Sequence, residues 1–425
     1  MTSSMTLKTA LAIKTASSWL SRVLLLWLLL GSQASFADTS KVIVMTSYPQ
    51  EVVSQFEAAF EKQYPQYKLE ILWRQSRDAM SYFKESGQPV DVYWTPAQRN
   101  FAQLEKMQAF QPLDIKLDGL PETVNGFPLR EGQHIASEIA GYGIVSNPQA
   151  LAAAGLPVPH DWADLSQPGF KGKVALPIPS KVGYAPPLID ILLQGYGWQA
   201  GWNLLQAIAA NAELVTAGAT FVTDDVASGR LFAGLTIDFF TASAIANGAP
   251  LQFAYPKLTG YSPAHVAIMK HAANPEGAKA FSAFVLSEQG QRLLFHPDIR
   301  KLPVRASVYA DKPAGYFNPF ENNPAFVYDN RRGLARQEAT NALFDAIITL
   351  NLAPLQQAIR AIESASAKLG ADAPQVTKAR ELLQKLPIDE TAAESLQPPK
   401  QADISRWQQV MHERYQEAAR IASQR

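Results

Sequence analysis

The chain has 425 residues, with 38 Lys and Arg against 38 Asp and Glu, so its formal net charge is zero. At 47% hydrophobic residues it is long and apolar enough for two or three globular domains. The balanced charge predicts no surface that tracks a phosphate backbone, so nucleic acid is not an expected partner. The lack of cysteine excludes disulfides, thiolate metal sites and cysteine nucleophiles.

Residues 1–37 differ in composition from the rest of the chain. They carry only three charges, all basic, and their apolar run 23–30 (VLLLWLLL) is much shorter than the ~20 residues that span a bilayer. Residues 35–37 (SFA) place small side chains at the two positions that a signal peptidase reads. We therefore expect residues 1–37 to be a cleaved secretory signal peptide and the mature protein to be periplasmic. An uncleaved N-terminal anchor is the alternative.

The first part of the chain, from residue 38 to about 138, alternates buried-strand and amphipathic-helix patterns. Strands are expected over the apolar runs 42–45, 68–73 and 90–94. Helices are expected over 52–60, from 79 onward, and after a turn at 95–97, where Pro96 is expected at the first helical position. Strands that alternate with helices predict a mainly parallel sheet with both faces covered.

The next part, to about residue 256, has the pattern of a second α/β unit. Strands are expected at 139–145, 173–176, 231–238 and 251–254. One helical face is expected to carry Trp198, Trp202, Leu205 and Ile208, and residues 223–225 (TDD) are expected to cap a short helix. A further strand at 265–269 precedes a helix capped by Asn274 with Pro275 first inside.

Beyond residue 330 the strand pattern stops and apolar residues repeat at helical spacing. Three or four helices are expected, with apolar positions at Leu343, Ile347, Leu350, Leu355, Ile359, Ile362, Ile404, Trp407, Met411, Ala418 and Ile421. Their apolar faces are expected to support the α/β body; a docking surface for a partner is the alternative.

Five segments carry a resemblance to a known family: 41–64, 90–97 (VDVYWTPA), 156–184, 223–239 and 265–294. In this order they resemble the type 2 periplasmic solute-binding proteins of ABC importers, in the branch for ferric iron, thiamine, polyamines, phosphonates and phosphorylated sugars. The resemblance covers about residues 41–310.

The resemblance implies an α/β fold of two lobes that close over a ligand like a hinge; the helical spacing beyond residue 330 adds a C-terminal all-helical extension. Lobe 1 would comprise 38–138 plus 257–330, lobe 2 would comprise 139–256, and the extension 331–425. The implied partners are a small molecule and an inner-membrane ABC permease, or a two-component sensor as in some members. A monomer is expected.

Polar groups occur in five turns at predicted strand-to-helix junctions. These are Thr46-Ser47-Tyr48, Ser76-Arg77, Thr95 with Arg99, Ser180-Lys181-Val182-Gly183, and Ala217-Gly218-Ala219-Thr220. Hydroxyls and free amides at helix N-termini, together with one or two cations, suit a phosphate, phosphonate or carboxylate. Arg77 and Lys181 are the expected charge partners. Each turn taken alone is also consistent with an ordinary helix cap, and Arg99 with a solvated helix face.

Four further residues are candidates for the cleft. Asp238 ends a predicted strand and either accepts a hydrogen bond from the ligand or caps the next helix. Trp94, Tyr184 and Tyr255 are candidate aromatic walls, although a Trp that ends a strand also suits the core.

An anionic ligand fits these residue types best. Ferric-binding members present two adjacent tyrosines, whereas this chain has Gly183-Tyr184-Ala185 there and no Tyr-Tyr pair. A polyamine would need several carboxylates and an aromatic box. Thiamine, polyamine and iron remain the alternatives.

No catalytic motif is present. The sequence lacks G-x-S-x-G, H-E-x-x-H and G-x-x-x-x-G-K-[ST], and its six histidines show no metal-ligand spacing. We expect a binding protein without cofactor or metal, not an enzyme. An envelope interaction protein acting through the C-terminal helices is the second alternative.

Overall fold

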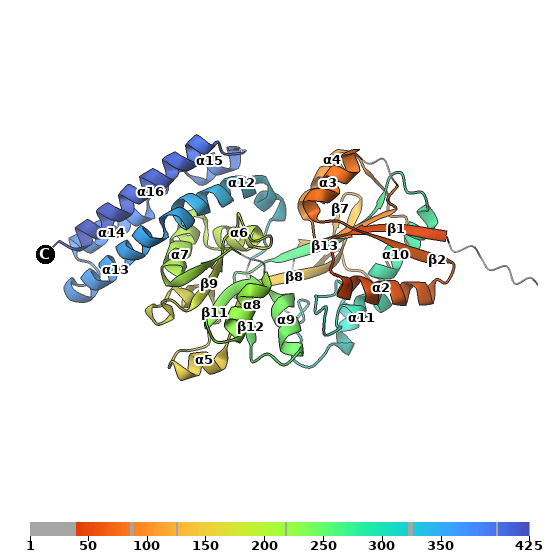
Figure 1. Cartoon of the computed structure of the whole chain (residues 1–425), viewed down its shortest axis with the longest axis horizontal. Coiled ribbons are helices and arrows are strands. Elements are labelled where there is room, and N and C mark those ends of the chain that lie inside the picture. Colours follow the sequence, from red (N-terminus) through yellow and green to blue (C-terminus); the bar gives the residue numbers. More distant parts are fainter. Residues whose placement is uncertain are drawn as a thin grey trace, which may run out of the picture.

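The structure is a computed structural model that describes residues 40–85, 89–124, 126–216, 219–321, 326–396 and 398–424. The expected signal peptide and the predicted turn residues 217–218 lie outside the described residues. The chain forms two α/β halves side by side, and its C-terminal helices extend from the second half (Figure 1). The two-lobed fold and the helical extension are thereby confirmed, whereas the lobe boundaries stay a prediction.

A single mixed sheet runs through both halves in the order β10-β9-β11-β8-β13-β3-β1-β2. The first half contains β1 (Ser40–Thr46), β2 (Tyr67–Trp73), β3 (Val92–Thr95), β4 (Phe110–Gln111) and β7 (Arg130–Glu131). The second contains β9 (Val174–Pro177), β10 (Ala212–Val215), β11 (Ala233–Ile237) and β12 (Gln252–Ala254). A small separate pair joins β5 (Thr123–Val124) to β6 (Phe127–Pro128).

Two long strands cross between the halves: β8 (His134–Ser146) and β13 (Tyr261–Met269). They pair with each other antiparallel, β13 also pairs with β3, and β8 also pairs with β11. All 13 residues of β8 are buried. The sequence placed the start of this strand at Ile139, which was wrong by five residues because the buried polar residues His134, Ser137 and Glu138 interrupt the apolar pattern.

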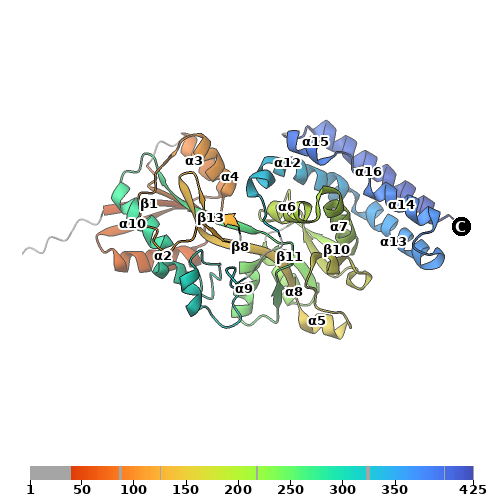
Figure 2. The ribbon, with the colours of Figure 1, turned by 180° about the vertical axis from the view of Figure 1, so that it is seen from behind.

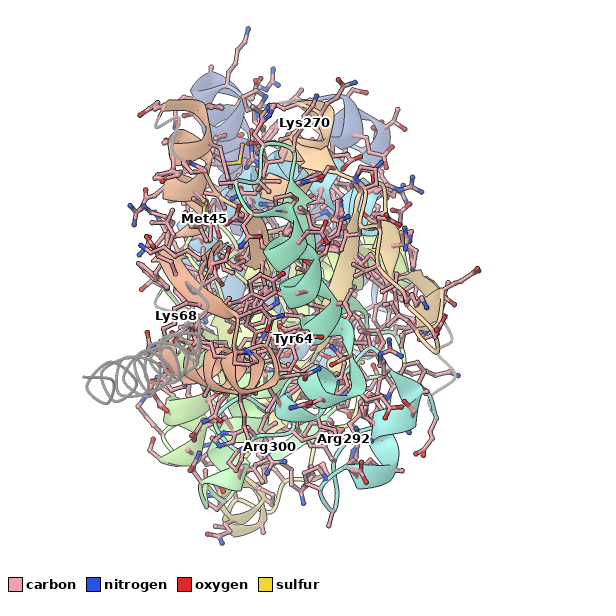
Figure 3. The ribbon with its side chains drawn as sticks, turned by 90° about the vertical axis from the view of Figure 1, so that its right-hand side faces the viewer. Met45, Tyr64, Lys68, Lys270, Arg292 and Arg300 are labelled. Carbon is pink, nitrogen blue, oxygen red and sulfur yellow. The ribbon has the colours of Figure 1, made fainter. Side chains whose placement is uncertain are left out.

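Helices cover both faces of the sheet. In the first half these are α2 (Gln50–Gln63), α3 (Ser76–Glu85), α4 (Gln98–Lys106), α10 (Pro275–Leu286) and α11 (Glu288–Leu293). In the second they are α5 (Pro148–Ala153), α6 (Ala185–Tyr196), α7 (Trp198–Asn211), α8 (Ala219–Ala227) and α9 (Asp238–Ala246). Short 3₁₀ turns lie at Trp162–Ser166, Pro168–Phe170, Ala306–Asp311 and Thr349–Asn351. Seen end-on, the first half exposes charged residues such as Lys68, Lys270 and Arg292 (Figure 3).

Most helix predictions are confirmed, and the errors lie at the helix starts. Asn274 caps α10 by accepting from the backbone N–H of Gly277 at 2.9 Å, as expected. α3 begins at Ser76, three residues before the predicted start, so the predicted turn is its first turn. α4 begins two residues after Pro96, and residues 223–225 lie inside α8 instead of capping it.

Five helices follow in the described C-terminal part, against the three or four expected. They are α12 (Asn330–Ile347), α13 (Leu352–Leu369), α14 (Pro374–Gln384), α15 (Glu390–Ser395) and α16 (Gln401–Ala422). α12 lies against α6, and α13 and α14 lie against α7 (Figures 1 and 2). The number of helices was underestimated because α15 is short and its apolar pattern is too weak to predict a separate helix.

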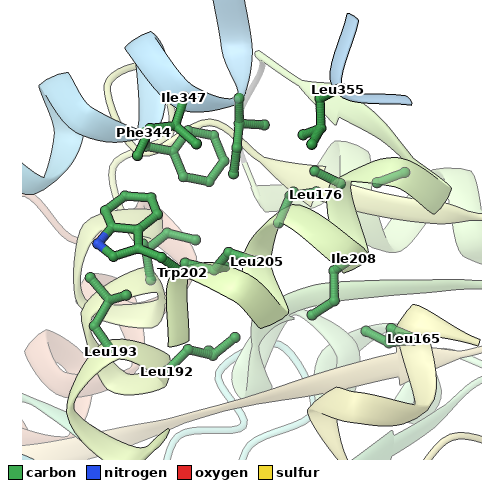
Figure 4. Packing of buried hydrophobic residues seen from close by; sticks show 14 of the residues in the cluster. Leu165, Leu176, Leu192, Leu193, Trp202, Leu205, Ile208, Phe344, Ile347 and Leu355 are labelled. Atoms are coloured by element: carbon green, nitrogen blue, oxygen red, sulfur yellow. The ribbon is translucent and has the colours of Figure 1, made fainter. Parts of the chain in front are cut away.

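The apolar faces of these helices are continuous with the core of the second half. Phe344, Ile347 and Leu355 pack against the Trp202 and Leu205 side of α7 (Figure 4). Leu350 is an exception, because half of its side chain is exposed although its spacing predicted a core position. By length and composition alone, the described stretch 330–369 contains a helix that would pass as a membrane span, but half of that window is buried in this core. The predicted supporting role is what the structure shows.

A buried ion pair also fixes α12 to α6. The guanidinium of Arg336, fully buried, donates from Nε to Oδ1 of Asp190 at 2.7 Å and from one terminal nitrogen to Oε1 of Glu390 at 2.5 Å. It also lies 5.1 Å from the ring centre of Trp198. Because Asp190 is almost fully buried, its charge depends on this partner.

We predict that Arg336→Ala lowers the free energy of unfolding by about 3–5 kcal/mol, since it leaves Asp190 buried without a counter-charge. Urea unfolding measures the change. The matched control is Arg406→Ala, which removes a mostly exposed arginine that pairs with Asp403, and it should change the free energy by no more than about 0.5 kcal/mol. Equal small effects of the two substitutions would contradict the anchoring of α12 by this pair.

Candidate functional site: a cleft between the two halves

A cavity of about 750 Å³ lies where the two halves and α12 meet. The first half contributes Ser76, Met80, residues 96–100 and Gln103. The crossing strands contribute Glu138, Ala140, Tyr142, Ser262 and Ala264, and the second half Gly183, Tyr184, Pro186, Pro187, Ile237, Phe239 and Phe240. The remaining lining residues are Lys301, Tyr328, Asn330, Gly333, Leu334 and Gln337. The cavity is therefore lined by parts of the chain that are far apart in the sequence.

The N-termini of five helices reach this cavity. Its lining includes the first residues of α3, α4 and α12, the residue before α6, and the second residue of α9. The first turn of a helix has free N–H groups and the positive end of the helix dipole. Proline at 186 and 187 removes two such groups from α6. At the start of α12 the N–H groups of Arg331 and Arg332 donate to Asp329 Oδ1, and in α4 those of Gln98 and Asn100 donate to the carbonyls of Pro96 and Ala97. The helix dipoles, more than free N–H groups, are therefore what favours negative charge near the cavity.

A buried ion pair lies at the base of the cavity. Lys301 Nζ is 2.5 Å from Oε1 of Glu138, and both side chains are less than a tenth exposed. The same ammonium group lies 4.0 Å from the ring centre of Phe239. Sequence reasoning missed both residues. A glutamate inside the apolar pattern 135–145 was the only available signal, and nothing in the sequence placed Lys301 beside it.

Free amide side chains face the cavity from opposite walls. Gln103 of α4 and Gln337 of α12 line it, and within the described residues neither side chain makes a hydrogen bond. By contrast, Gln98 donates to Oγ of Ser262 at 2.6 Å, and Asn100 donates to the Tyr93 hydroxyl at 2.8 Å. Gln103 and Gln337 are thus the amides available to a ligand, and sequence reasoning did not find them.

Three predicted site residues line the cavity: Ser76, Gly183 and Tyr184. Arg99, the least specific candidate, also lines it and pairs with Glu338 of α12 at 2.5 Å. Burial raises the pKa of Tyr184, so its phenol is neutral and donates to the Leu235 carbonyl at 3.3 Å. This cluster is the part of the predicted site that the structure brings together.

The predicted residues at the ends of β1 and β3 are not among those that line the cavity. Ser47 Oγ is 2.5 Å from Thr95 Oγ1, and Thr46 Oγ1 accepts from the Tyr48 N–H at 3.1 Å. The Tyr48 ring lies 4.6 Å from that of Trp94, whose indole donates to Ser137 at 3.1 Å. These side chains are mostly bonded to one another, so their ligand-binding role stays a prediction.

The other predicted turns are less informative. Ser180 and Lys181 are exposed and are not part of the cavity lining. Arg77 and Thr220 lie in the first turns of α3 and α8, and their side chains are outside the described structure. Their role in binding also stays a prediction.

The buried Asp238 and the half-buried Tyr255 form a hydrogen-bonded group next to the crossing strand β8. Oδ2 of Asp238 accepts from the Gly141 N–H at 2.7 Å and from the Tyr255 hydroxyl at 2.9 Å. The Tyr255 ring stacks on Phe317 at 3.8 Å between ring centres. A Cβ atom at Gly141 would lie 2.5 Å from the Tyr255 ring, so this contact requires glycine. Burial raises the pKa of Asp238 to about 7, against the opposing effect of these hydrogen bonds.

The comparisons with known proteins agree with this architecture. Residues 88–325 match the family model of the bacterial extracellular solute-binding proteins. The chain belongs to this family. It is 33% identical over 294 residues to the phosphoglycerate transport regulatory protein PgtC of Salmonella typhimurium, an alignment that covers 68% of this chain and 72% of that protein. The expected family is thus confirmed.

Solved periplasmic binding proteins share the fold. AfuA of Actinobacillus pleuropneumoniae with fructose-6-phosphate bound has a TM-score of 0.59 at 20% identity, covering 70% of this chain and 94% of AfuA. Iron-bound HitA of Pseudomonas aeruginosa has a TM-score of 0.58 at 18% identity, covering 71% and 98%. PotD, the spermidine/putrescine-binding protein of Streptococcus pneumoniae, has a TM-score of 0.59 at 12% identity, covering 75% and 99%. At these identities the likeness shows the fold alone.

The buried carboxyl of Asp238 predicts a pH dependence. Because its folded pKa of about 7 exceeds the ordinary value of 3.8, its contribution to stability is fully present below about pH 4 and is lost as the pH rises to about 7. Asp238→Asn stays neutral and lacks this loss. The free energy of unfolding of the variant minus that of the wild type should therefore increase over this range, as measured by urea unfolding. A difference that stays constant with pH would contradict a raised pKa of the buried Asp238 carboxyl.

Proposed function

We propose that the protein captures a small anionic metabolite, phosphorylated or a phosphonate, between its lobes and presents it to an ABC importer or a membrane sensor. The observation that carries this proposal is a cavity lined by the starts of five helices, in which the one described lining carboxylate, Glu138, is neutralised by Lys301. The free amides of Gln103 and Gln337 add hydrogen-bond donors. The names of PgtC and of sugar-phosphate-bound AfuA support the same ligand class.

Cationic and iron ligands fit the cavity less well. A polyamine has several ammonium groups, but Glu138 is the one acidic residue among the described lining residues and is already paired. In the part of the chain that the structure describes, no group of three His, Asp or Glu side chains is placed to hold a metal ion. Burial raises the pKa of Tyr142 and of Tyr184, which opposes the phenolate form that iron requires.

The proposed location and partners are supported by the family and by the composition of residues 1–37. A family of extracellular solute-binding proteins and an N-terminal segment with signal-peptide composition support a periplasmic protein that closes on its ligand. The closed shape is then what an inner-membrane permease or a two-component sensor recognises. The regulatory role in the name of PgtC supports the sensor as the second possible partner.

We predict that residues 38–425 are stabilised by a phosphorylated or phosphonate compound in a thermal-shift screen. The panel contains phosphoglycerates, sugar phosphates, phosphonates, inorganic phosphate, thiamine, polyamines and ferric citrate. A ligand at ~100 times its dissociation constant stabilises the native state by about 2.7 kcal/mol. A shift with a polyamine or ferric citrate alone would contradict the anionic ligand while leaving the solute-binding family intact.

Gln103→Ala should weaken binding of the compound identified in this way by about 0.5–1.5 kcal/mol, because one hydrogen bond to the ligand is lost. Isothermal titration calorimetry measures the affinity. Gln401→Ala, at an exposed position at the start of α16, is the matched control and should bind like the wild type. Unchanged affinity of Gln103→Ala would remove Gln103 from the site.

A further inference from the structure

Helix α12 presents one face to the ligand cavity. Asn330, Gly333, Leu334 and Gln337 line the cavity and follow one another at spacings of three or fewer residues along this helix. They share the cavity lining with residues of α3 and α4 of the first half. The C-terminal helices therefore do more than extend the core of the second half.

The remainder of α12 is fixed to the second half. Arg336 pairs with Asp190 of α6, and Phe344 and Ile347 are part of the same apolar core as α7. At the start of the helix, the backbone N–H of Asp329 donates to Gln194 Oε1 of α6 at 3.0 Å. A helix held at its start, middle and end moves with the second half as one body.

Glu338, next to Gln337, connects this body to the first half. Its Oε1 lies 2.5 Å from a terminal nitrogen of Arg99, which is on α4. Arg99 also lines the cavity, so the ion pair lies beside the ligand space. Because the two partners belong to different halves, their distance depends on how far the cleft is closed.

We propose that α12 is a third wall of the ligand cleft and that the Arg99–Glu338 ion pair holds the first half against this wall when the cleft closes. The inference deepens the proposed function, because its ligand consequences rest on binding in this cavity. The third wall limits the ligand to a small molecule and shields it from solvent. The ion pair is partly exposed, with 57% and 38% of the side chains accessible, so it adjusts closure modestly.

The lack of cysteine makes closure directly measurable. Lys106→Cys on α4 and Ser364→Cys on α13 introduce two exposed labelling sites, one in each moving body. Double electron–electron resonance spectroscopy then measures the distance between spin labels attached at the two sites. Arg99→Gln and Glu338→Gln should each lower the ratio of closed to open molecules by about two- to fivefold. The swap Arg99→Glu with Glu338→Arg should restore the wild-type ratio. Arg406→Gln, which removes a surface pair remote from the cleft, is the control and should change nothing.

The wall is tested by a bulky substitution at Leu334. Leu334→Trp places an indole ring in the cavity, so it should lengthen the label separation and weaken binding of 3-phosphoglycerate by about tenfold or more. Ala335→Trp, at the adjacent exposed position that does not line the cavity, is the matched control and should do neither. Thermal unfolding of both variants checks that they fold.

The outcomes separate this inference from the proposed function. If the label distances respond as expected while no anionic compound binds, the third wall stands and the proposed ligand is wrong. The opposite result is that 3-phosphoglycerate binds equally to the wild type and to Leu334→Trp, and that the label separation does not change on substitution of Arg99, Glu338 or Leu334. In that case the third wall is overturned and the anionic ligand stands.

Discussion

The antiparallel pairing of β8 with β13 is the constraint on which the rest of this structure depends. Because the two strands cross from one half to the other, they set the cavity base where Glu138 and Ser262 face the ligand space. The buried partners of these strands reinforce that base: Lys301 pairs with Glu138, and Asp238 accepts from the Gly141 N–H. A charge or hydrogen bond removed there would disturb both halves at once, since the two strands belong to the sheet of each half.

The C-terminal helices change the usual picture of a two-walled cleft. Their core is continuous with that of the second half, and the Arg336–Asp190 pair makes α12 part of the same body. Yet α12 also supplies its first residue and a free amide to the cavity, and its Glu338 pairs with the lining residue Arg99. A relative that lacks these helices would therefore differ in its ligand site as well as in its surface. The same observation gives less support to the alternative of an envelope interaction protein that acts through its C-terminal helices. The apolar faces of these helices are already packed against the second half.

The parts that could be predicted from the sequence are those that depend on neighbours along the chain. The apolar run 42–45, the helical face around Trp202 and the Asn274 cap are local patterns, and the structure contains each of them. The hydroxyl-bearing turns were also found locally, but whether a side chain faces the cavity depends on the packing of distant segments. That is why Ser76 lines the cavity whereas Ser180 does not, and why Lys301 and Gln337 gave no signal before folding brought them together.

The most direct test of this account is calorimetry on residues 38–425 with 3-phosphoglycerate and with its unphosphorylated counterpart, glycerate. The phosphate group would receive charge-assisted hydrogen bonds from the donors that line the cleft, each worth about 1.5–3 kcal/mol. The account predicts one molecule of 3-phosphoglycerate bound per chain and binding of glycerate at least about tenfold weaker. Equal affinity for the two compounds, or binding of a polyamine with no binding of either, would contradict it.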